Sequence, residues 1–436
     1  MKKRTAKAIA VHKANAIKRN AAETCAPIPP PIKVPAEDMV AAALYTGTTF
    51  QQQHDSLLMM GLIPESRSSF YRKQKVSVEN IKQATEASMK SARERFSGNA
   101  AIDGRWAHRV RSPQGTVIMA DTSSEDRAVL WRENLICEGG GRKNPNYTGS
   151  PGNMETEGTR RMFTKLYNEG FLEKIDTITR DRDNKSGKIM NQFDIREREL
   201  HDPGHVKKSF SKKLSAFINS YRNYEYTTQE GTDVCIRSPF QGLKGPLENY
   251  FSYVIKEEDR DIREYKWLNA VDHFTGNHEN CEHKDDLSCY FWRTGYEHPP
   301  LQKILYNFLN DFSPIIRKLC SSHSSQIVES INSSIAASAP KNISWKEYEA
   351  RVDVAILKHN EPFEAPRIIR ECCGVREPST MVQNEWEKTT SSIKSRREES
   401  HSPQQIRKKN ARRYREKNKY KITDSCDYKN SKIEDE

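Results

Sequence analysis

The alternation of apolar and polar positions along the chain predicts a protein that mixes strands and helices. Three short apolar runs are bounded by turn residues, which is typical of consecutive strands in a meander. Farther along, apolar residues recur at helical spacing and then form one more strand-like run. The expected elements, in chain order, are strands at 99–106, 115–122 and 128–136, a helix from Met154 to about Tyr167, a strand within 171–181 and a helix at 184–195.

The flanking segments are predicted to be helical, and both ends of the chain are predicted to be disordered. Before the strands, Val78, Ile81 and Phe96 fall on roughly one face of a helix. The first 35 residues end in a proline-rich run without periodicity, and the residues after about 390 are polar and poor in aliphatic side chains. The predicted regions are a disordered basic tail (1–35), a helical region (36–98), the first part of a core (99–200), a helical insertion (201–322), the closing helices of the core (323–365) and a basic, largely disordered tail (366–436).

The order of these elements predicts the fold class. Three antiparallel strands followed by a helix and a parallel strand form the opening of an RNase H-like fold. We therefore expect an α/β protein whose RNase H-like core is a mixed sheet with three antiparallel opening strands. A large helical insertion would interrupt this core, and disordered basic tails would flank it.

Positive charge is concentrated at the two ends of the chain. The net charge is +12, to which residues 1–35 contribute +7 and residues 394–421 contribute +9, while residues 422–436 carry −3. The body between the tails is therefore almost neutral. Basic tails suit a polyanion such as DNA or a nuclear import receptor, and the alternative is that they only aid solubility.

The hydropathy predicts an intracellular protein, which would keep its cysteines reduced. The sequence contains no run of 18 apolar residues and no uncharged apolar stretch near its N-terminus, so neither a membrane span nor a signal peptide is expected. The nine cysteines are scattered. Metal ligation or plain burial therefore accounts for them better than a disulfide framework does.

Three carboxylates stand where such a core can bring them together. Asp103 lies in the first strand, Asp181 ends the fourth strand, and Glu329 lies on a late helix. Two divalent ions about 3.5–4 Å apart, held by carboxylates, activate phosphoryl transfer, and Mg²⁺ prefers such oxygen ligands. Most acidic residues are solvated surface groups. The hypothesis therefore depends on context, because Asp103 is embedded in an apolar strand and Glu329, beside Val328 and Ile331, is expected near the buried side of its helix.

A cluster of cysteine and histidine residues predicts a structural zinc site. His273, His278, Cys281 and Cys289 offer four ligands of the types that zinc takes. Four protein ligands leave no open position, so the site would stabilise a loop without taking part in catalysis. The alternative is that these are ordinary polar loop residues, because the spacing is not that of a common zinc finger.

A basic helix follows the core strands and offers a contact surface for DNA. Lysine side chains contact the DNA backbone through charge without reading the base sequence. The alternative is a solvated basic face that binds nothing. The residues concerned are His205, Lys207, Lys208, Lys212 and Lys213.

Several blocks of the sequence, in the same order and at plausible spacing, resemble the transposases of Mutator-like elements. They are DGRW at 103–106, NYTGSPGNMETEG at 146–158, TRDRDNK at 179–185, GHVKKS at 204–209, the cysteine and histidine cluster, and ESINS at 329–333. The resemblance covers about residues 40–365. It implies a DDE transposase that cuts and joins DNA strands with two Mg²⁺ or Mn²⁺ ions. By motif, Asp103 and Asp181 correspond to the two catalytic aspartates of the family, and Glu329 corresponds to its glutamate.

The chain departs from the family pattern near these residues. Arg182 stands where glycine is frequent, and Asp202 stands where many relatives have a cysteine three residues before the histidine. The alternative function is therefore a catalytically inactive or domesticated DNA-binding descendant. Two other hypotheses are an RNase H-like nuclease acting on RNA or a hybrid, and a zinc-stabilised scaffold protein. The resemblance also implies transposon ends and target DNA as partners and a homo-oligomer on paired ends. Together with the basic tails, this function predicts a nuclear location.

Overall fold

The structure is a computed structural model, and the chain forms two compact units, of which the first ends at Gly374 and the second begins at Val375. In the part of the chain that is described, no helix has both the length and the apolar composition that a bilayer crossing requires. The structure describes residues 32–106, 113–124, 126–138, 145–181, 184–228, 230–275, 277, 279, 298–319, 325–339, 345–377, 379–400, 407–408 and 411–412.

The first unit opens with helices that pack around the long helix α4 (Arg67–Glu94). The side chain of Ser66 caps α4 by accepting a hydrogen bond from the backbone N–H of Ser69. The stripe that α4 buries includes Ser77, Thr85 and Ser88 as well as apolar residues. Before α4 come β1 (Lys33–Val34), α2 (Ala36–Thr46), α3 (Phe50–Met59) and β2 (Ile63–Pro64), and β1 pairs with β2 in parallel. The predicted helical character of this region is confirmed.

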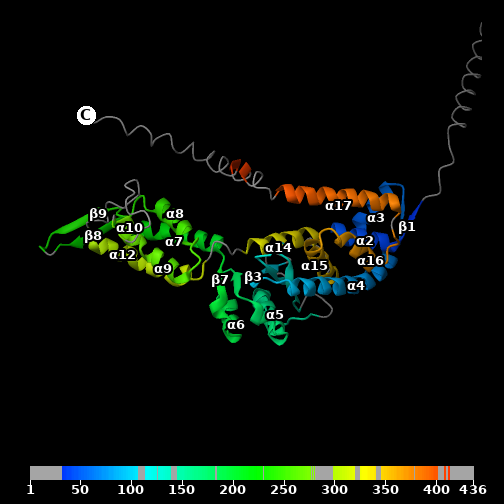
Figure 1. The fold of residues 1–436 in the computed structure, drawn as a ribbon, viewed down its shortest axis with the longest axis horizontal. Coiled ribbons are helices and arrows are strands. Elements are labelled where there is room, and N and C mark those ends of the chain that lie inside the picture. Colours follow the sequence, from blue (N-terminus) through cyan, green and yellow to red (C-terminus); the bar gives the residue numbers. More distant parts are fainter. Residues whose placement is uncertain are drawn as a thin grey trace, which may run out of the picture. The chain divides into compact units, whose positions relative to one another are not determined.

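The centre of the first unit is a five-stranded mixed sheet (Figure 1). If the strands are numbered in chain order, their order across the sheet is 3-2-1-4-5. The first three strands pair antiparallel, and the last two add in parallel. The strands are β3 (Asn99–Trp106), β4 (Gln114–Asp121), β5 (Val129–Ile136), β6 (Thr177–Arg180) and β7 (Glu199–His201). This topology confirms the predicted mixed sheet with three antiparallel opening strands, and it is consistent with an RNase H-like core.

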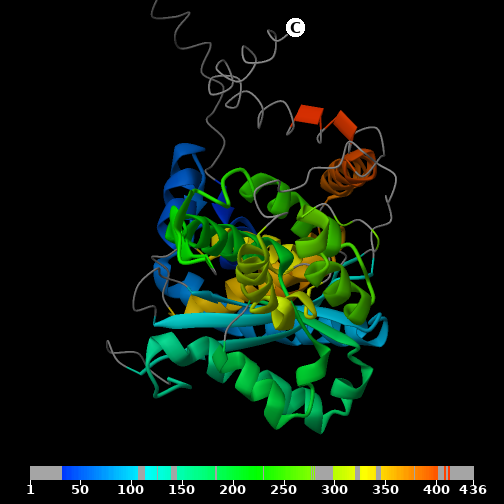
Figure 2. The same ribbon diagram turned by 90° about the vertical axis from the view of Figure 1, so that its left-hand side faces the viewer.

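Helices cover both faces of this sheet, so β4 is buried along its whole length (Figure 2). On one face, Ala100, Ile102 and Met119 pack against α5 and α6. On the other face, Ala101 and Ile118 pack against α14, α15 and α4. The elements that complete the two faces are η1 (Pro151–Asn153), α5 (Met154–Asn168), η2 (Phe171–Lys174), α6 (Asn184–Gln192), η3 (Arg196–Arg198), α14 (Gln326–Ser338) and α15 (Trp345–Asn360). The strand predicted within 171–181 is shorter than its apolar run, because residues 171–174 form a 3-10 turn.

The insertion between β7 and α14 has an apolar core of its own. Phe210, Phe251 and Trp267 pack edge-to-face or stacked at the centre of that core. Its helices are α7 (Pro203–Ser220), α8 (Lys244–Val254), α9 (Arg260–Leu268), α10 (Ala270–Phe274), α12 (Pro299–Asn310) and α13 (Ser313–Ile316). The insertion was predicted as helices and loops, and the structure adds a hairpin of two strands, β8 (Asn223–Thr227) and β9 (Asp233–Arg237).

The C-terminal region is more ordered than predicted. The prediction that residues 366–436 are largely disordered is wrong for two segments, α16 (Ala365–Cys373) and α17 (Thr380–Ser400). Helix α16 buries Ile369 and Cys373 and packs against α2 and α4, which explains why it is ordered. Helix α17 belongs to the second unit.

Candidate active site

Strand pairing places Asp103 beside Asp181. Strands β3 and β6 run in parallel, and Ile102 is paired with Arg180 at the end of their ladder. Asp103 follows Ile102 in β3, and Asp181 follows Arg180, the last residue of β6. The two aspartates therefore lie beside each other at this end of the paired strands. The guanidinium of Arg180 donates to the backbone carbonyl of Asp181 at 2.9 Å and forms a buried ion pair with Glu199 of the neighbouring strand. This pairing holds the backbone of Asp181 in position.

Helix α14 brings Glu329 to the same place. Asn332 lies one turn after Glu329, and its Nδ2 donates to Asp103 Oδ2 at 2.8 Å. The other oxygen of Asp103 accepts from the backbone N–H of Gly104, also at 2.8 Å. The expectation that Glu329 faces the buried side of its helix is wrong, because Val328 and Ile331 occupy that side and the Glu329 side chain is 50% exposed.

His205 lies between the carboxylates. Its Nδ1 is 2.8 Å from Asp181 Oδ1, and its Nε2 is 3.8 Å from Glu329 Oε1. The imidazole is 40% exposed and the Asp181 side chain 47%, so this side of the cluster is open to solvent. The cluster therefore contains Asp103, Asp181, Glu329 and His205, and it is formed by two strands and two helices.

Asp202 ties together the two helices that carry His205 and Glu329. One oxygen of this buried carboxylate accepts from the backbone N–H of His205 at 3.0 Å and caps α7. The other oxygen accepts from the N–H and from the hydroxyl of Ser325, both at 2.9 Å, just before α14 begins. Asp202 therefore has a structural role that a cysteine, with its weaker sulfur acceptor, would not fill equally well.

The negative charges of the cluster act on one another. Burial, together with the charges of Asp181 and Glu329, raises the pKa of Asp103 to about 6, although the hydrogen bonds from Asn332 and Gly104 oppose this rise. Burial also raises the pKa of Asp181, while His205 counteracts that rise. The site therefore holds carboxylates whose ionised forms are destabilised, and a cation would relieve this destabilisation.

The donor set suits a hard divalent cation. Carboxylate oxygens are the ligands that Mg²⁺ prefers, and each oxygen of Asp103 retains a lone pair beyond its one hydrogen bond. Within the described residues, no three His, Cys, Asp or Glu side chains are arranged as they stand to hold a metal ion. The side chains of Asp181 and Glu329 are about half exposed, so a change of rotamer can turn them toward Asp103. Arg182 and Asp183 lie outside the described residues.

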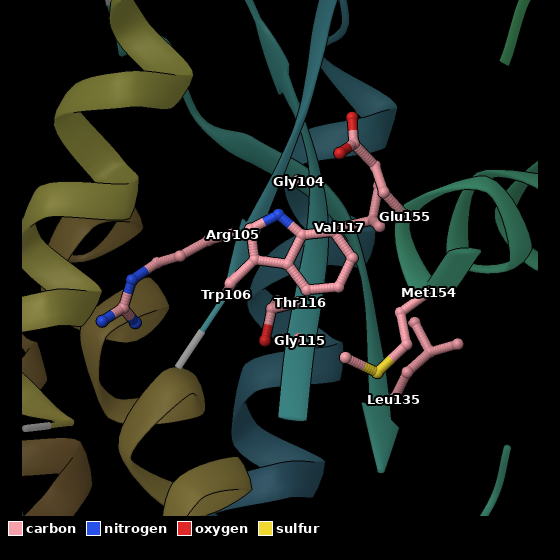
Figure 3. Close-up of a pocket in the computed structure, with 9 residues that line it drawn as sticks. All are labelled: Gly104, Arg105, Trp106, Gly115, Thr116, Val117, Leu135, Met154 and Glu155. Atoms are coloured by element: carbon pink, nitrogen blue, oxygen red, sulfur yellow. The ribbon is translucent and has the colours of Figure 1, made fainter. Parts of the chain in front are cut away.

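The residue after Asp103 faces the opposite side of the sheet. A Cβ on Gly104 would lie 2.6 Å from Cγ of Glu155, so glycine permits α5 to approach β3 closely. Figure 3 shows Glu155 and Met154 on one side of Trp106 and the Arg105 guanidinium turned away from them. The recess that these residues line leaves no room for a bound molecule, not even a water. Glu155 is therefore separated from the carboxylate cluster by the strand itself.

The predicted basic surface lies on α7, the first helix of the insertion. Lys207 donates to Ser252 at 2.6 Å, and Lys213 lies over the ring of Phe312. The side chains of Lys208 and Lys212 are exposed. Contact of these lysines with DNA stays a prediction.

Most of the predicted zinc site falls outside the described residues. His278, Cys281 and Cys289 lie there. His273 is described, and it is buried on α10, with its ring packed against Tyr250. The zinc site therefore stays a prediction.

Sequence reasoning missed two members of the site. Asn332 follows Glu329 by three residues and therefore shares its helix face, which is a signal that the sequence carries. Asp202 begins the sequence Asp-Pro-Gly-His, in which an aspartate before a proline is typical of a helix N-cap. The contact of His205 with Asp181 and Glu329 carries no such signal, because it depends on where the insertion starts.

Comparison with known proteins supports the resemblance. No curated protein matches the chain. A model of the Mutator-like transposase family matches residues 12–289, a range that includes Asp103, Asp181 and His205 and ends before Glu329. The chain belongs to the Mutator-like transposase family.

Proposed function

We propose that this protein is a DDE transposase that cuts DNA at the ends of its element and joins those ends to target DNA. The observation that carries the proposal is the convergence of Asp103, Asp181 and Glu329 at a five-stranded mixed sheet, which is consistent with an RNase H-like core, in a member of this family. The proposed partners are transposon ends and target DNA, bound by a homo-oligomer on paired ends. The proposed location is the nucleus, with the basic tails as the import signal.

Asp103, Asp181 and Glu329 would hold the divalent ions, which supply Lewis-acid catalysis and activation of the attacking oxygen. Asn332 and the backbone N–H of Gly104 fix both oxygens of Asp103, so this carboxylate is oriented before any substrate arrives. Both reactions, strand cleavage by water and strand transfer by a 3′-hydroxyl, are in-line displacements at phosphorus. Positioning and charge neutralisation supply most of the rate enhancement in such displacements.

The second candidate is a catalytically inactive DNA-binding descendant. It is favoured by Arg182, which stands between Asp181 and Asp183 where relatives often have glycine. A bulky cation beside a metal ligand would compete for the carboxylates. This candidate predicts DNA binding without metal-dependent cleavage.

The test is a cleavage and joining assay with DNA that carries the element's own ends, in Mg²⁺ or Mn²⁺. The wild type should cut at the element boundary and join the cut ends to target DNA, whereas Asp103→Ala and Glu329→Gln should bind the DNA without cutting it. Glu329 is half exposed, so its replacement by glutamine should leave the fold intact. Cleavage that survives both substitutions would refute the assignment. Binding without cleavage by the wild type would establish the second candidate.

A further inference from the structure

Helix α7 carries an exposed polar stripe that starts at the carboxylate cluster. At 100° per residue, His205, Lys208, Lys212, Ser215 and Asn219 fall within one face of the helix. The opposite face is occupied by apolar residues of the insertion core. All four lysines of α7 are exposed, but Lys207 and Lys213 contact Ser252 and Phe312 at the edges of that core. Lys208 and Lys212 are the two that lie within the stripe.

The stripe ends at a surface cavity of about 340 Å³. This volume is at the lower end of the range for ligand sites, which is about 300–1,000 Å³. Two cations, Arg222 and Lys244, line the cavity at the base of the β8–β9 hairpin. Its other polar lining consists of Ser215, Asn219, Ser238 and Gln241.

The chemistry of this lining suits an anion that carries several oxygens. No carboxylate lines the cavity among the residues that the structure describes. The guanidinium of Arg222 makes a long hydrogen bond of 3.4 Å to Asn219, and within the described residues this planar group has further donors that can bind an oxyanion. Hydroxyl and amide groups add neutral donors, which are the groups that proteins combine with arginine and lysine to bind phosphates.

The length of α7 relates this cavity to the carboxylate cluster. From His205 to Asn219 the helix rises about 21 Å, since 14 residues advance about 1.5 Å each. Duplex DNA advances about 3.4 Å per base pair, so this length corresponds to about six base pairs. A duplex that follows the stripe would therefore place a backbone phosphate at the cavity about six base pairs from the bond at the carboxylates.

We propose that the cavity formed by Arg222 and Lys244 binds a backbone phosphate of duplex DNA about six base pairs from the cleavage point. Lys208 and Lys212 contact the backbone between the two places. This inference rests on the proposed function, because it takes DNA as the substrate of the carboxylate cluster. A solvated basic face would also explain exposed lysines, but it does not explain a cavity with two cations at the end of the stripe.

The test compares binding to duplexes of different length by fluorescence anisotropy in EDTA, where no cleavage occurs. The duplexes share one element end and are shortened stepwise on either side of the cleavage point. Arg222→Gln/Lys244→Gln should bind the longest duplex about five- to tenfold more weakly than the wild type at physiological salt. The double substitution should also make the negative slope of log affinity against log salt concentration shallower, by about one for every phosphate that the variant no longer neutralises. On duplexes that end fewer than about six base pairs from the cleavage point, the two proteins should bind equally.

The matched control removes the same charge elsewhere on the insertion. Lys256→Gln/Lys303→Gln replaces two exposed lysines that do not line the cavity, and it should change the affinity less than twofold at every length. Equal binding of the longest duplex by the wild type and the Arg222/Lys244 variant would overturn the inference, as would a weakening that is the same at all lengths. Binding of inorganic phosphate that depends on Arg222 and Lys244, together with unchanged DNA binding by the variant at every length, would make the cavity a site for free phosphate and would also overturn the inference.

The two proposals fail in different ways. A wild type that cleaves its element ends, together with an Arg222/Lys244 variant that binds every duplex normally, would refute the cavity alone. A wild type with no affinity for DNA at low salt would refute the proposed function and the cavity with it.

Discussion

Replacing Asp103 by asparagine should make the metal-free protein more stable at neutral pH. The carboxylate of Asp103 lies next to Asp181 and Glu329 and is largely buried, so its ionised form is destabilised in the folded state. Asparagine is uncharged and nearly the same size. Its amide can keep a hydrogen bond to Asn332, because the buried Oδ1 of Asn332 has no hydrogen-bond partner among the described residues and can accept one if the amide turns over.

The size of the effect follows from the pKa. The pKa of Asp103 is about 6 in the folded protein, against an ordinary value of 3.8, which corresponds to about 3 kcal/mol at about 1.4 kcal/mol per pKa unit. Because the cluster opens to solvent on the Asp181 side, about 1–3 kcal/mol is the reasonable range. Below pH 3.8 the side chain is protonated in both states and the penalty vanishes. Between pH 3.8 and about 6 the folded state binds more protons than the unfolded state, so stability falls as pH rises, and above that range the penalty is fully present.

The measurement is urea denaturation in EDTA from about pH 4 to about pH 8, followed by tryptophan fluorescence. Asp103→Asn should exceed the wild type by about 1–3 kcal/mol at about pH 7.5, and the difference should shrink toward zero near pH 4. Asp311→Asn removes an exposed carboxylate and should give no such pH-dependent difference. Added Mn²⁺ should stabilise the wild type and not the Asn variant, which reverses the order. A variant that is less stable than the wild type at neutral pH, or a difference that does not change with pH, would refute the electrostatic reasoning.

Two further predictions concern the packing of the core. Gly158→Ala should destabilise the protein by about 1–3 kcal/mol, because a Cβ there would lie 2.5 Å from Cγ2 of Val117 and would push α5 away from the sheet. The control Gly152→Ala, whose Cβ would have no atom within 4 Å, should not change the stability, and thermal denaturation of both variants checks this. Arg132→Met should cost about 3–5 kcal/mol because it leaves the buried carboxylate of Asp353 unpaired, and Arg132→Met/Asp353→Leu should recover much of that stability in urea denaturation. A double variant no more stable than the single one would contradict the second prediction.

Most of the sheet could be predicted from the sequence because its longer strands are recognisable from their local pattern of apolar residues and turns. Strands β3, β4 and β5 are apolar runs separated by turn residues, and their order with α5 and β6 restricts the topology strongly. Strand β7 was not predicted, because three residues are too few to show an alternation of apolar and polar positions. Helix α16 was not predicted for a different reason: its burial depends on contact with α2 and α4, which lie far earlier in the chain.

The face of a helix proved harder to predict than its existence. The predicted apolar face of the helix that corresponds to α4 included Val78, Ile81 and Phe96, but the structure buries Ser77, Thr85 and Ser88 together with Ile81. These small polar side chains are tolerated because their hydroxyls find acceptors, such as the backbone carbonyl of Ile81 for Thr85 and the carboxylate of Glu361 for Ser88. A pattern based on hydrophobicity alone cannot detect a helix face on which hydrogen-bonded polar side chains are buried.

The candidate site shows why long-range geometry could still be predicted in part. Glu329 is 148 positions after Asp181, and no local rule relates the two. The insertion between them is closed at its base, because His201 of β7 bridges to Leu319 and Asp202 accepts hydrogen bonds from both the N–H and the hydroxyl of Ser325. Its length therefore has little influence on where α14 starts. The same closure places His205, the third residue of α7, against Asp181 and Glu329, so the insertion contributes a side chain to the site as well as spanning the gap between its carboxylates.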